Sequence, residues 1–309
     1  MPLISVLTSI YNETFQEIRQ AIQSIQKQTF KDWELILVND NPHRPDLILW
    51  LKSFVKTDPR IRLLLNPENI GLARSMNRAA DAACGTYLAR MDADDISTPK
   101  RLEKELSLLL SEDCGLVCSR YKTIDEQGYI LWQEGPCYTP KQMAALLPCR
   151  NIIHHPTVLM RKDLFLHAGG YRPYPCAQDY DLWLRFLKMG AKMVMHQEAL
   201  LYYRIRLSST TGQRRYLQAL TLNYIRKTYR KNQILNLKPP FFDYESYLHQ
   251  HGYHNPKARK RFEKATKLLK ESQTLSHPQK FIRQLCAALI CEVYRRNFLY
   301  QIQAKRLRK

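Results

Sequence analysis

The chain has 309 residues, of which 45% are hydrophobic and 25% charged, a composition typical of a globular protein. That length fits one large domain with an appendage, or two modest domains. The net charge of +20 is unevenly spread: residues 1–202 carry 24 Lys and Arg against 23 Asp and Glu, whereas residues 203–309 carry 24 against 5. We therefore expect the C-terminal third to bind a polyanion, such as lipid phosphate, nucleic acid or acidic polysaccharide.

The sequence also argues against several classes of protein. No run reaches the roughly 18–20 apolar residues that a membrane-spanning helix needs. Residues 1–7 lack the basic segment and cleavage site of a secretion signal and instead predict a strand. The eight cysteines include no Cys-x-x-Cys pair and no zinc-like cluster with histidine, which predicts buried free thiols in a reducing compartment. We expect a cytoplasmic protein.

Strand-like and helix-like patterns alternate over the first 120 residues. The expected strands are 4–10, 35–38, 61–65, 88–91 and 116–119. The expected helices are 15–28, 45–56, 72–84 and 99–110. Because the strands are almost continuously apolar, the pattern predicts an α/β fold whose mostly parallel sheet is covered by helices on both faces.

The pattern is less regular after residue 120. We expect strands at 156–160, 193–196 and 200–205 and a helix at 179–189. The remainder is helical in pattern and strongly basic. These observations predict two parts, an α/β domain at 1–207 and a helical basic region at 208–309.

A cluster of carboxylates follows the fourth predicted strand, in the sequence Asp92-Ala93-Asp94-Asp95. Side chains alternate along a strand, so Asp92 and Asp94 point the same way. Like charges this close repel unless a cation holds them, and oxygen ligands suit Mg²⁺ or Mn²⁺. The alternative is a solvated acidic turn that caps the helix opened by Pro99.

Polar residues also follow two earlier strands, Tyr11 after the first and Asp40 after the second. Ligands of such sheets bind beyond the carboxyl ends of the strands. Three strand ends that deliver polar groups to one edge favour a binding site over a simple turn.

Four segments in this order and spacing resemble the family 2 glycosyltransferases, which are inverting enzymes of the GT-A fold. The resemblance covers roughly residues 3–207. The segments are 4–12, 34–40, 68–73 with its continuation to 90–95, and 178–185. The resemblance implies a GT-A fold and the transfer of a sugar from a nucleotide-sugar.

The resemblance assigns the donor site to the strand ends. It implies that Asp92 and Asp94 hold Mn²⁺ or Mg²⁺ on the donor's diphosphate, with Asp92 also near the ribose. It implies that Tyr11 stacks on the base, that Asp40 accepts a hydrogen bond from a pyrimidine N–H and that Ser9 lies nearby. Most family members carry two acids where this chain has Asn39-Asp40, but the acid at the base-binding position is retained.

Two further positions leave alternatives open. Arg74 either reaches a phosphate of the donor or faces solvent on its helix. Asp95 either joins the metal site or caps the helix that Pro99 opens.

Asp179 is the expected catalytic base. An inverting transferase needs one carboxylate to take the proton of the attacking hydroxyl. Gln178 replaces the usual first acid of the family's pair, but Asp179 fills the second place; its alternative role is a helix N-cap. Asp181, one turn into the helix, is expected to be structural.

Three histidines are candidates for lesser roles. His154 and His155 precede a predicted strand, where neighbours point to opposite faces, so at most one should face the site. The alternative for either is a structural histidine. His196 is a candidate third metal ligand.

The sequence thus predicts a non-processive glycosyltransferase, because the Gln-x-x-Arg-Trp motif and membrane spans of processive polysaccharide synthases are missing. We expect it to move a hexose or N-acetylhexosamine, from a UDP-sugar on family frequency, to a lipid-linked, lipopolysaccharide or capsule glycan. Residues 281–309 suit an interfacial helix on an anionic membrane, or else a helix that packs on the catalytic domain with its charges solvated.

Two rival functions remain at this point. A sugar-nucleotide nucleotidyltransferase shares the α/β pattern and the cation chemistry, but it needs a Gly-rich phosphate loop where Tyr11-Asn12-Glu13-Thr14 stands. A nucleic-acid-binding protein would use the basic region, whose tyrosines permit base stacking, but this leaves the acidic strand ends unexplained.

Overall fold

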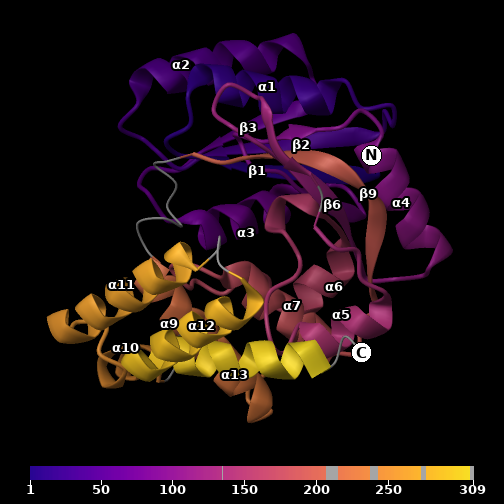
Figure 1. The fold of residues 1–309 in the computed structure, drawn as a ribbon. Helices are drawn as coiled ribbons and strands as arrows, with labels where there is room; N and C mark the ends of the chain where they lie inside the picture. The colour runs from indigo at the N-terminus through magenta and orange to yellow at the C-terminus, as the bar shows by residue number, and fades with distance from the viewer. Residues whose placement is uncertain (134, 207–214, 237–242, 273–275, 307–309) are drawn as a thin grey trace. The chain divides into compact units, whose positions relative to one another are not determined.

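The computed structural model describes residues 1–133, 135–206, 215–236, 243–272 and 276–306 (Figure 1). It divides into two compact units. Unit 1 comprises Met1–Met143 and Ile153–Leu207, and unit 2 comprises Ala144–Ile152 and Ser208–Lys309. The boundary that we predict between residues 207 and 208 lies outside the described residues.

Unit 1 is built on one mixed, mostly parallel sheet. Its strand order is β3-β2-β1-β4-β8-β6-β9-β5, and β7 pairs with β6. The strands are β1 Ile4–Ile10, β2 Trp33–Asn39, β3 Ile61–Leu65, β4 Tyr87–Arg90, β5 Ile96–Ser97, β6 Leu116–Ile124, β7 Ile130–Gln133, β8 Val158–Arg161 and β9 Met193–Arg204. Strands β3, β2, β1 and β4 run parallel, as do β6 and β9, whereas β8 is antiparallel to both β4 and β6.

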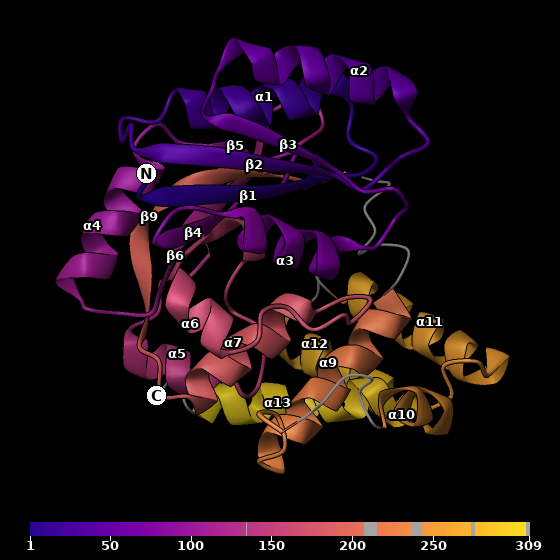
Figure 2. The same cartoon turned by 180° about the vertical axis from the view of Figure 1, so that it is seen from behind.

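Helices cover both faces of the parallel half of the sheet. Figure 2 shows α1 and α2 on one face and α3 on the other. The helices of unit 1 are α1 Phe15–Gln26, α2 Pro45–Phe54, α3 Leu72–Ala82, α4 Arg101–Ser111, α6 Lys162–His167 and α7 Gln178–Lys188, with short 3₁₀ turns η1 Val55–Thr57 and η2 His155–Thr157. Helix α5, Pro140–Leu146, begins in unit 1, and its last three residues belong to unit 2. Burial on both faces explains why the central strands are continuously apolar, and it confirms the predicted fold class.

Helix α1 starts with a capping box that later matters for the site. The Glu17 amide donates to Thr14 Oγ1 over 3.2 Å, and the Thr14 amide donates to Glu17 Oε2 over 2.7 Å. The side chains of Ile18, Ile22 and Ile25 then pack into the core beneath the sheet. Thr14 and Glu17 are thereby fixed at the carboxyl end of β1.

Most predicted elements of unit 1 are present, and the differences lie in its second half. The two strands expected at 193–196 and 200–205 form the single strand β9, whose middle residues Gln197 and Glu198 are exposed. These polar residues interrupt the apolar pattern where the pairing of β6 with β9 shifts register. The strand expected from Pro156 begins with η2, because Pro156 supplies no amide for a strand ladder.

Unit 2 consists of helices. They are α9 Arg215–Arg230, α10 Tyr244–Gln250, α11 Pro256–Glu271, α12 His277–Ile290 and α13 Glu292–Arg306. Among the described residues, no helix has both the length and the apolar content to cross a membrane.

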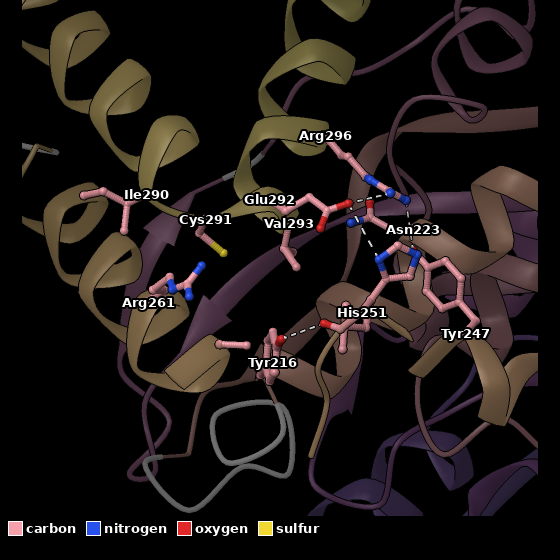
Figure 3. Close-up of a pocket in the computed structure, with 12 residues that line it drawn as sticks. Tyr216, Asn223, Tyr247, His251, Arg261, Ile290, Cys291, Glu292, Val293 and Arg296 are labelled. Atoms are coloured by element: carbon pink, nitrogen blue, oxygen red, sulfur yellow. Dashed lines mark hydrogen bonds and ion pairs between the residues drawn. The ribbon is translucent and has the colours of Figure 1, made fainter. Parts of the chain in front are cut away.

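A cavity of about 90 Å³ lies among the helices of unit 2 (Figure 3). On one side of it Glu292 accepts a hydrogen bond of 2.6 Å from Arg296, whose guanidinium also reaches the Tyr247 hydroxyl over 3.3 Å. Tyr216 donates its hydroxyl to the His251 carbonyl over 3.1 Å. These polar contacts tie α9, α10 and α13 together.

None of the eight cysteines forms a disulfide, which confirms the prediction of free thiols. The prediction that the cysteines are buried is correct for only half of them. The buried cysteines are Cys114, Cys118, Cys149 and Cys291. Cys84, Cys137 and Cys286 are exposed, because each sits at a loop or on the outer side of a helix.

Arg101 at the start of α4 joins the helix to the strand that carries the acidic cluster. It is fully buried and pairs with Glu105 over 3.1 Å. Its other nitrogens donate to the Arg90 carbonyl at 2.8 Å and to Ser97 Oγ at 3.1 Å.

We predict that Arg101→Met lowers the free energy of unfolding by about 3–5 kcal/mol, because it leaves the Glu105 carboxylate buried without its partner. Urea denaturation followed by circular dichroism measures the change. Lys192→Gln, which removes an exposed ion pair with Glu112, is the control and should cost far less. Equal losses in the two variants would contradict the role of Arg101.

Candidate active site

The carboxyl ends of β1, β2 and β4 meet at one edge of the sheet. Ile10 lies opposite Asn39 in the β1–β2 pairing, and the Asp40 amide donates to the Ile10 carbonyl over 2.8 Å. On the other side of β1, the Met91 amide donates to the Leu7 carbonyl over 3.1 Å. The parallel register therefore brings the residues that follow these strands to one rim, as the sequence predicts.

Asp40 is buried, and its carboxylate organises the loop that enters α3. Oδ1 accepts hydrogen bonds from Asn66 Nδ2 at 2.7 Å and the Ile70 amide at 2.9 Å, and Oδ2 accepts one from the Gly71 amide at 2.9 Å. Gly71 has φ of 81°, a left-handed conformation that favours glycine. Sequence reasoning missed this second task of Asp40, which is to hold the loop from Asn66 to Gly71.

The other predicted donor-binding residues lie around this edge with accessible side chains. Tyr11 follows β1 and is 42% exposed. Its carbonyl accepts from Asn41 Nδ2 over 3.0 Å, so the backbone is held while the ring faces outward. Ser9 is partly exposed near the end of β1. Arg74 is exposed on the first turn of α3 and makes no hydrogen bond or ion pair within the described part of the chain.

Asp92, Asp94 and Asp95 converge after β4. One oxygen of each lies within 4.8 Å of the other two. Burial and the Asp92 charge raise the pKa of Asp94 to about 7. Burial, followed by the charges of Asp92 and Asp94, raises the pKa of Asp95 well above its ordinary value. Both shifts disfavour the ionised carboxylates, and a cation beside them would stabilise the ionised forms.

Asp95 adds an observation that bears on a metal ion. It is completely buried, its Oδ1 accepts the Arg204 amide at 2.9 Å, and its Oδ2 is buried without a hydrogen-bond partner. An unpartnered buried carboxylate oxygen beside two further carboxylates fits a hard divalent cation. The residues present therefore fit Mg²⁺ or Mn²⁺.

The expectation that Asp95 caps the helix at Pro99 is wrong. Helix α4 begins at Arg101, and the residue at its N-cap, Lys100, makes no side-chain capping bond. The short strand β5 intervenes and pairs with β9, which turns the Asp95 side chain into the acidic cluster.

Three arginines that the sequence analysis missed surround the acids. Arg90, the last residue of β4, is buried and forms an ion pair with Asp92. Arg204 donates Nε to the Asp94 carbonyl over 2.8 Å, and its other nitrogens reach Gln20 and the carbonyls of two residues, Asp125 and Glu126. Arg206 lies beside the Asp94 carboxylate, with Nε 2.9 Å from Oδ2. The signal for the last two is in Tyr203-Arg204-Ile205-Arg206, where alternation along an extended chain predicts two guanidiniums on one side.

Both histidines of the His154-His155 pair lie close enough to Arg90 for its charge to lower the pKa of each, and that at most one of them faces the site stays a prediction. Strand alternation does not apply, because η2 begins at His155. His155 Nε2 is 2.8 Å from the Tyr171 hydroxyl, and the His154 ring stacks on Tyr121 at 4.0 Å between centroids. Burial lowers the pKa of His154 to about 4, and burial together with the Arg90 charge lowers the pKa of His155 further below its usual range. Both imidazoles are therefore neutral near pH 7.

His196 does not join the acidic cluster. It lies on β9, and its Nδ1 accepts the Glu198 amide over 3.1 Å. Among the described residues the group with metal-ligand spacing contains three aspartates and no histidine, so the prediction of His196 as third ligand is wrong.

Asp179 is the second residue of α7 and is partly exposed. It is not the N-cap, because that position belongs to Ala177 in a left-handed conformation with φ of 59°. Burial raises the pKa of Tyr171 above its usual range, and the charges of Asp179 and Asp92 both add to this rise. The charge of Asp179 and the charge of Asp92, which belongs to the acidic cluster, thus both raise the pKa of Tyr171.

Asp181 has the structural place that the sequence predicts. It is fully buried and pairs with Arg185 over 2.8 Å and with Arg172 over 3.3 Å. Arg185 in turn donates to the Gly170 carbonyl over 2.7 Å, so this carboxylate fastens the first turn of α7 to the segment before it.

The sheet with its acidic rim defines a transferase of the GT-A fold, and comparison with known proteins agrees. The profile of Glycosyl transferase family 2 matches residues 5–168, and the chain belongs to this family. An uncharacterised glycosyltransferase of Methanocaldococcus jannaschii is 34% identical over 234 residues, covering 75% of this chain and 81% of the relative. The O-antigen biosynthesis glycosyltransferase WbnJ of Escherichia coli is 32% identical over 214 residues, covering 68% and 82%.

Solved structures share the fold. The crystal structure of S. aureus TarS 1-349 in complex with UDP-GlcNAc has a TM-score of 0.59 and 15% identity, covering 99% of this chain and 91% of that one. Identity this low establishes the fold alone. Together with the family match, it confirms the predicted GT-A fold and shows that the protein is a glycosyltransferase.

We predict that Arg204→Lys loosens the acidic loop, because a lysine cannot replace four hydrogen bonds made by one planar guanidinium. Hydrogen exchange measured by mass spectrometry should be faster in peptides covering residues 91–97. Arg161→Lys, which alters a guanidinium bound to Asp113 and the Cys114 carbonyl, is the control and should leave that peptide unchanged. Unchanged exchange in Arg204→Lys would contradict this role.

Proposed function

We propose that this protein is a non-processive inverting glycosyltransferase that uses a nucleotide-sugar, with a UDP-sugar favoured, and adds a hexose or N-acetylhexosamine to a hydroxyl of a surface glycan. The observation that carries the proposal is the convergence of Tyr11, Asp40 and the aspartate cluster at one edge of a parallel sheet. An E. coli relative named for O-antigen biosynthesis and a structural neighbour bound to UDP-GlcNAc support the choice of acceptor and donor.

The donor's nucleotide is assigned to the first two strand ends. The exposed Tyr11 ring offers a face for stacking on the base, and Ser9 lies beside it on β1. Asp40 has a free lone pair left on Oδ2, since that oxygen accepts only the Gly71 amide, and this lone pair can accept a pyrimidine N–H. Arg74, exposed at the start of α3, is placed to attract a phosphate.

The diphosphate is assigned to the aspartate cluster. Asp92 and Asp94 would hold Mn²⁺ or Mg²⁺, with the open oxygen of Asp95 behind them. The cation would supply positive charge where the leaving diphosphate gains negative charge. Arg90 pairs with Asp92 from the buried side.

Asp179 is the proposed base. Its carboxylate takes the proton of the acceptor hydroxyl while that oxygen forms a bond to the anomeric carbon and the bond to the diphosphate oxygen breaks. Attack from the side opposite the leaving group inverts the configuration. The neutral rings of His154 and His155 can donate and accept hydrogen bonds to sugar hydroxyls without adding charge.

The rival functions have less support. A nucleotidyltransferase would need a phosphate-binding glycine loop after β1, where this chain has the Thr14–Glu17 capping box of α1. A nucleic-acid-binding protein would have no use for buried carboxylates at the strand ends of unit 1.

We predict that Asp179→Asn abolishes transfer while donor binding remains, because the amide keeps the shape but cannot accept the proton. Transfer is measured as UDP release in the presence of acceptor, and donor binding by calorimetry. Asp181→Asn is the matched control: it should lower thermal stability by breaking the pair with Arg185, and its turnover per folded molecule should persist. Persistent turnover in Asp179→Asn would refute the assignment of the base.

The acceptor side of the proposal includes an anionic membrane surface bound by unit 2. Residues 208–309 carry 22 Lys and Arg against 5 Asp and Glu. Helix α12 exposes Ile282 at 59%, Leu285 at 43% and Leu289 at 68%, a spacing that places them on one face. An apolar face on a basic helical region suits the headgroup boundary of an anionic leaflet, where each basic residue contributes about 1 kcal/mol.

We predict that the protein sediments with vesicles of phosphatidylcholine and phosphatidylglycerol, and that it does so less in high salt or with phosphatidylcholine alone. The double variant Ile282→Glu, Leu289→Glu should lose this binding. Leu110→Glu, which charges an equally exposed leucine of unit 1, should keep it. Equal retention of both variants would show that α12 does not contact the membrane.

A further inference from the structure

Arg206 contacts three carboxylates from two segments of unit 1, the start of α1 and the loop after β4. Its Nε lies 2.9 Å from Asp94 Oδ2, its Nη2 lies 3.4 Å from Glu13 Oε1, and its Nη1 lies 3.6 Å from Glu17 Oε2. Each nitrogen of the guanidinium therefore lies within ion-pair distance of a different acid, although Nε makes no hydrogen bond. The side chain is 19% exposed, so it lies at the rim of the cluster and still touches solvent.

Two of these acids are held by other bonds and form a fixed anchor. Glu13 Oε2 accepts the Tyr11 amide over 2.6 Å, and Glu17 Oε2 accepts both the amide and the hydroxyl of Thr14 in the capping box. Among the described residues, no hydrogen bond of this kind holds the Asp94 carboxylate, and Arg206 lies beside it. Arg206 thus links the Asp94 carboxylate to two carboxylates that other bonds hold in place.

The Asp94 carboxylate, which lies beside Arg206, belongs to the group with metal-ligand spacing. A divalent cation on Asp94 and a guanidinium beside the same carboxylate repel each other. Arg206 lies at the solvent-exposed rim, unlike the buried Arg90 beside Asp92. We propose that Arg206 is the resident counter-ion of Asp94, that a divalent cation displaces it, and that the displaced guanidinium, still held by Glu13 and Glu17, then binds the donor's diphosphate.

This inference rests on the proposed function and adds a regulatory property to the same site. Without a nucleotide, the cation must compete with Arg206, which weakens its binding. With a nucleoside diphosphate present, the guanidinium gains a new anionic partner and releases Asp94 at less cost. Cation and nucleotide should therefore strengthen each other's binding, and part of this coupling should pass through Arg206.

The test measures Mn²⁺ affinity from the electron paramagnetic resonance signal of free Mn²⁺, on the full chain, with and without UDP. Arg206→Gln keeps the length and polarity of the side chain but removes its charge. We expect it to bind Mn²⁺ about tenfold more tightly than the wild type without UDP, and to show a smaller gain in affinity when UDP is added. Thermal denaturation checks that the variant is folded.

Arg44→Gln is the matched control. The Arg44 guanidinium donates to the Glu13 carbonyl over 2.7 Å, so this change removes the same charge from the same neighbourhood without touching Asp94. We expect its Mn²⁺ affinity to equal that of the wild type. If Arg44→Gln raised the Mn²⁺ affinity as much as Arg206→Gln, the effect would come from the loss of any nearby positive charge. That result would overturn the inference.

The remaining outcomes separate the inference from the proposed function. If the wild type and Arg206→Gln bound Mn²⁺ with equal affinity, Arg206 would not compete with the cation. If Asp94→Asn then lost Mn²⁺ binding, the proposed cation site would still be supported. Mn²⁺ binding by Arg206→Gln but not by the wild type would support the competition in its strongest form. Absence of Mn²⁺ binding in both proteins would overturn the cation site and the competition together.

Discussion

The site depends on the compensation of negative charge at the end of a buried strand. Asp92, Asp94 and Asp95 follow β4 within a few ångströms of one another; Asp95 is buried, and Asp92 and Asp94 are partly exposed. Carboxylates in such a place stay ionised only beside cations. The chain supplies these as arginines, one from β4, one at the end of β9 and one just after it, and one oxygen of Asp95 is buried without a hydrogen-bond partner.

This constraint explains the topology around the site. Arg204 and Arg206 are more than 100 residues from the aspartates in sequence, and β9 brings them there by running parallel to β6 and pairing with β5. The shift of register between β6 and β9 lets the strand cross the sheet and end beside the acidic loop. Arg101, at the start of α4, also contacts this region, because it donates a hydrogen bond to the Arg90 carbonyl at the end of β4.

Local pattern made the parallel half of the fold predictable. Apolar strands with helical stretches between them imply a parallel sheet, and parallel strands imply that Tyr11, Asp40 and Asp92 share an edge. Long-range pairing was less predictable, since β5 has only two residues and β9 contains an exposed polar stretch that looks like a break. For the same reason the sequence predicted the acids but not their partners: a carboxylate cluster is local, whereas the guanidiniums that balance it arrive through tertiary pairing. Asp95 shows the limit of local reasoning, because a capping role suited its sequence position until β5 was found between it and α4.

The two units balance charge in different ways, and this difference bears on function. Three buried arginines of unit 1, Arg90, Arg101 and Arg185, have carboxylate partners within the unit. Residues 208–309 have 22 basic residues and only 5 acidic ones, so most of their cations have no possible partner there. Their counter-charge must come from solvent ions or from a bound polyanion. A basic surface alone would suit any polyanion, but the apolar face of α12 beside it favours a surface that offers both negative charge and hydrocarbon, which is the combination that an anionic membrane presents.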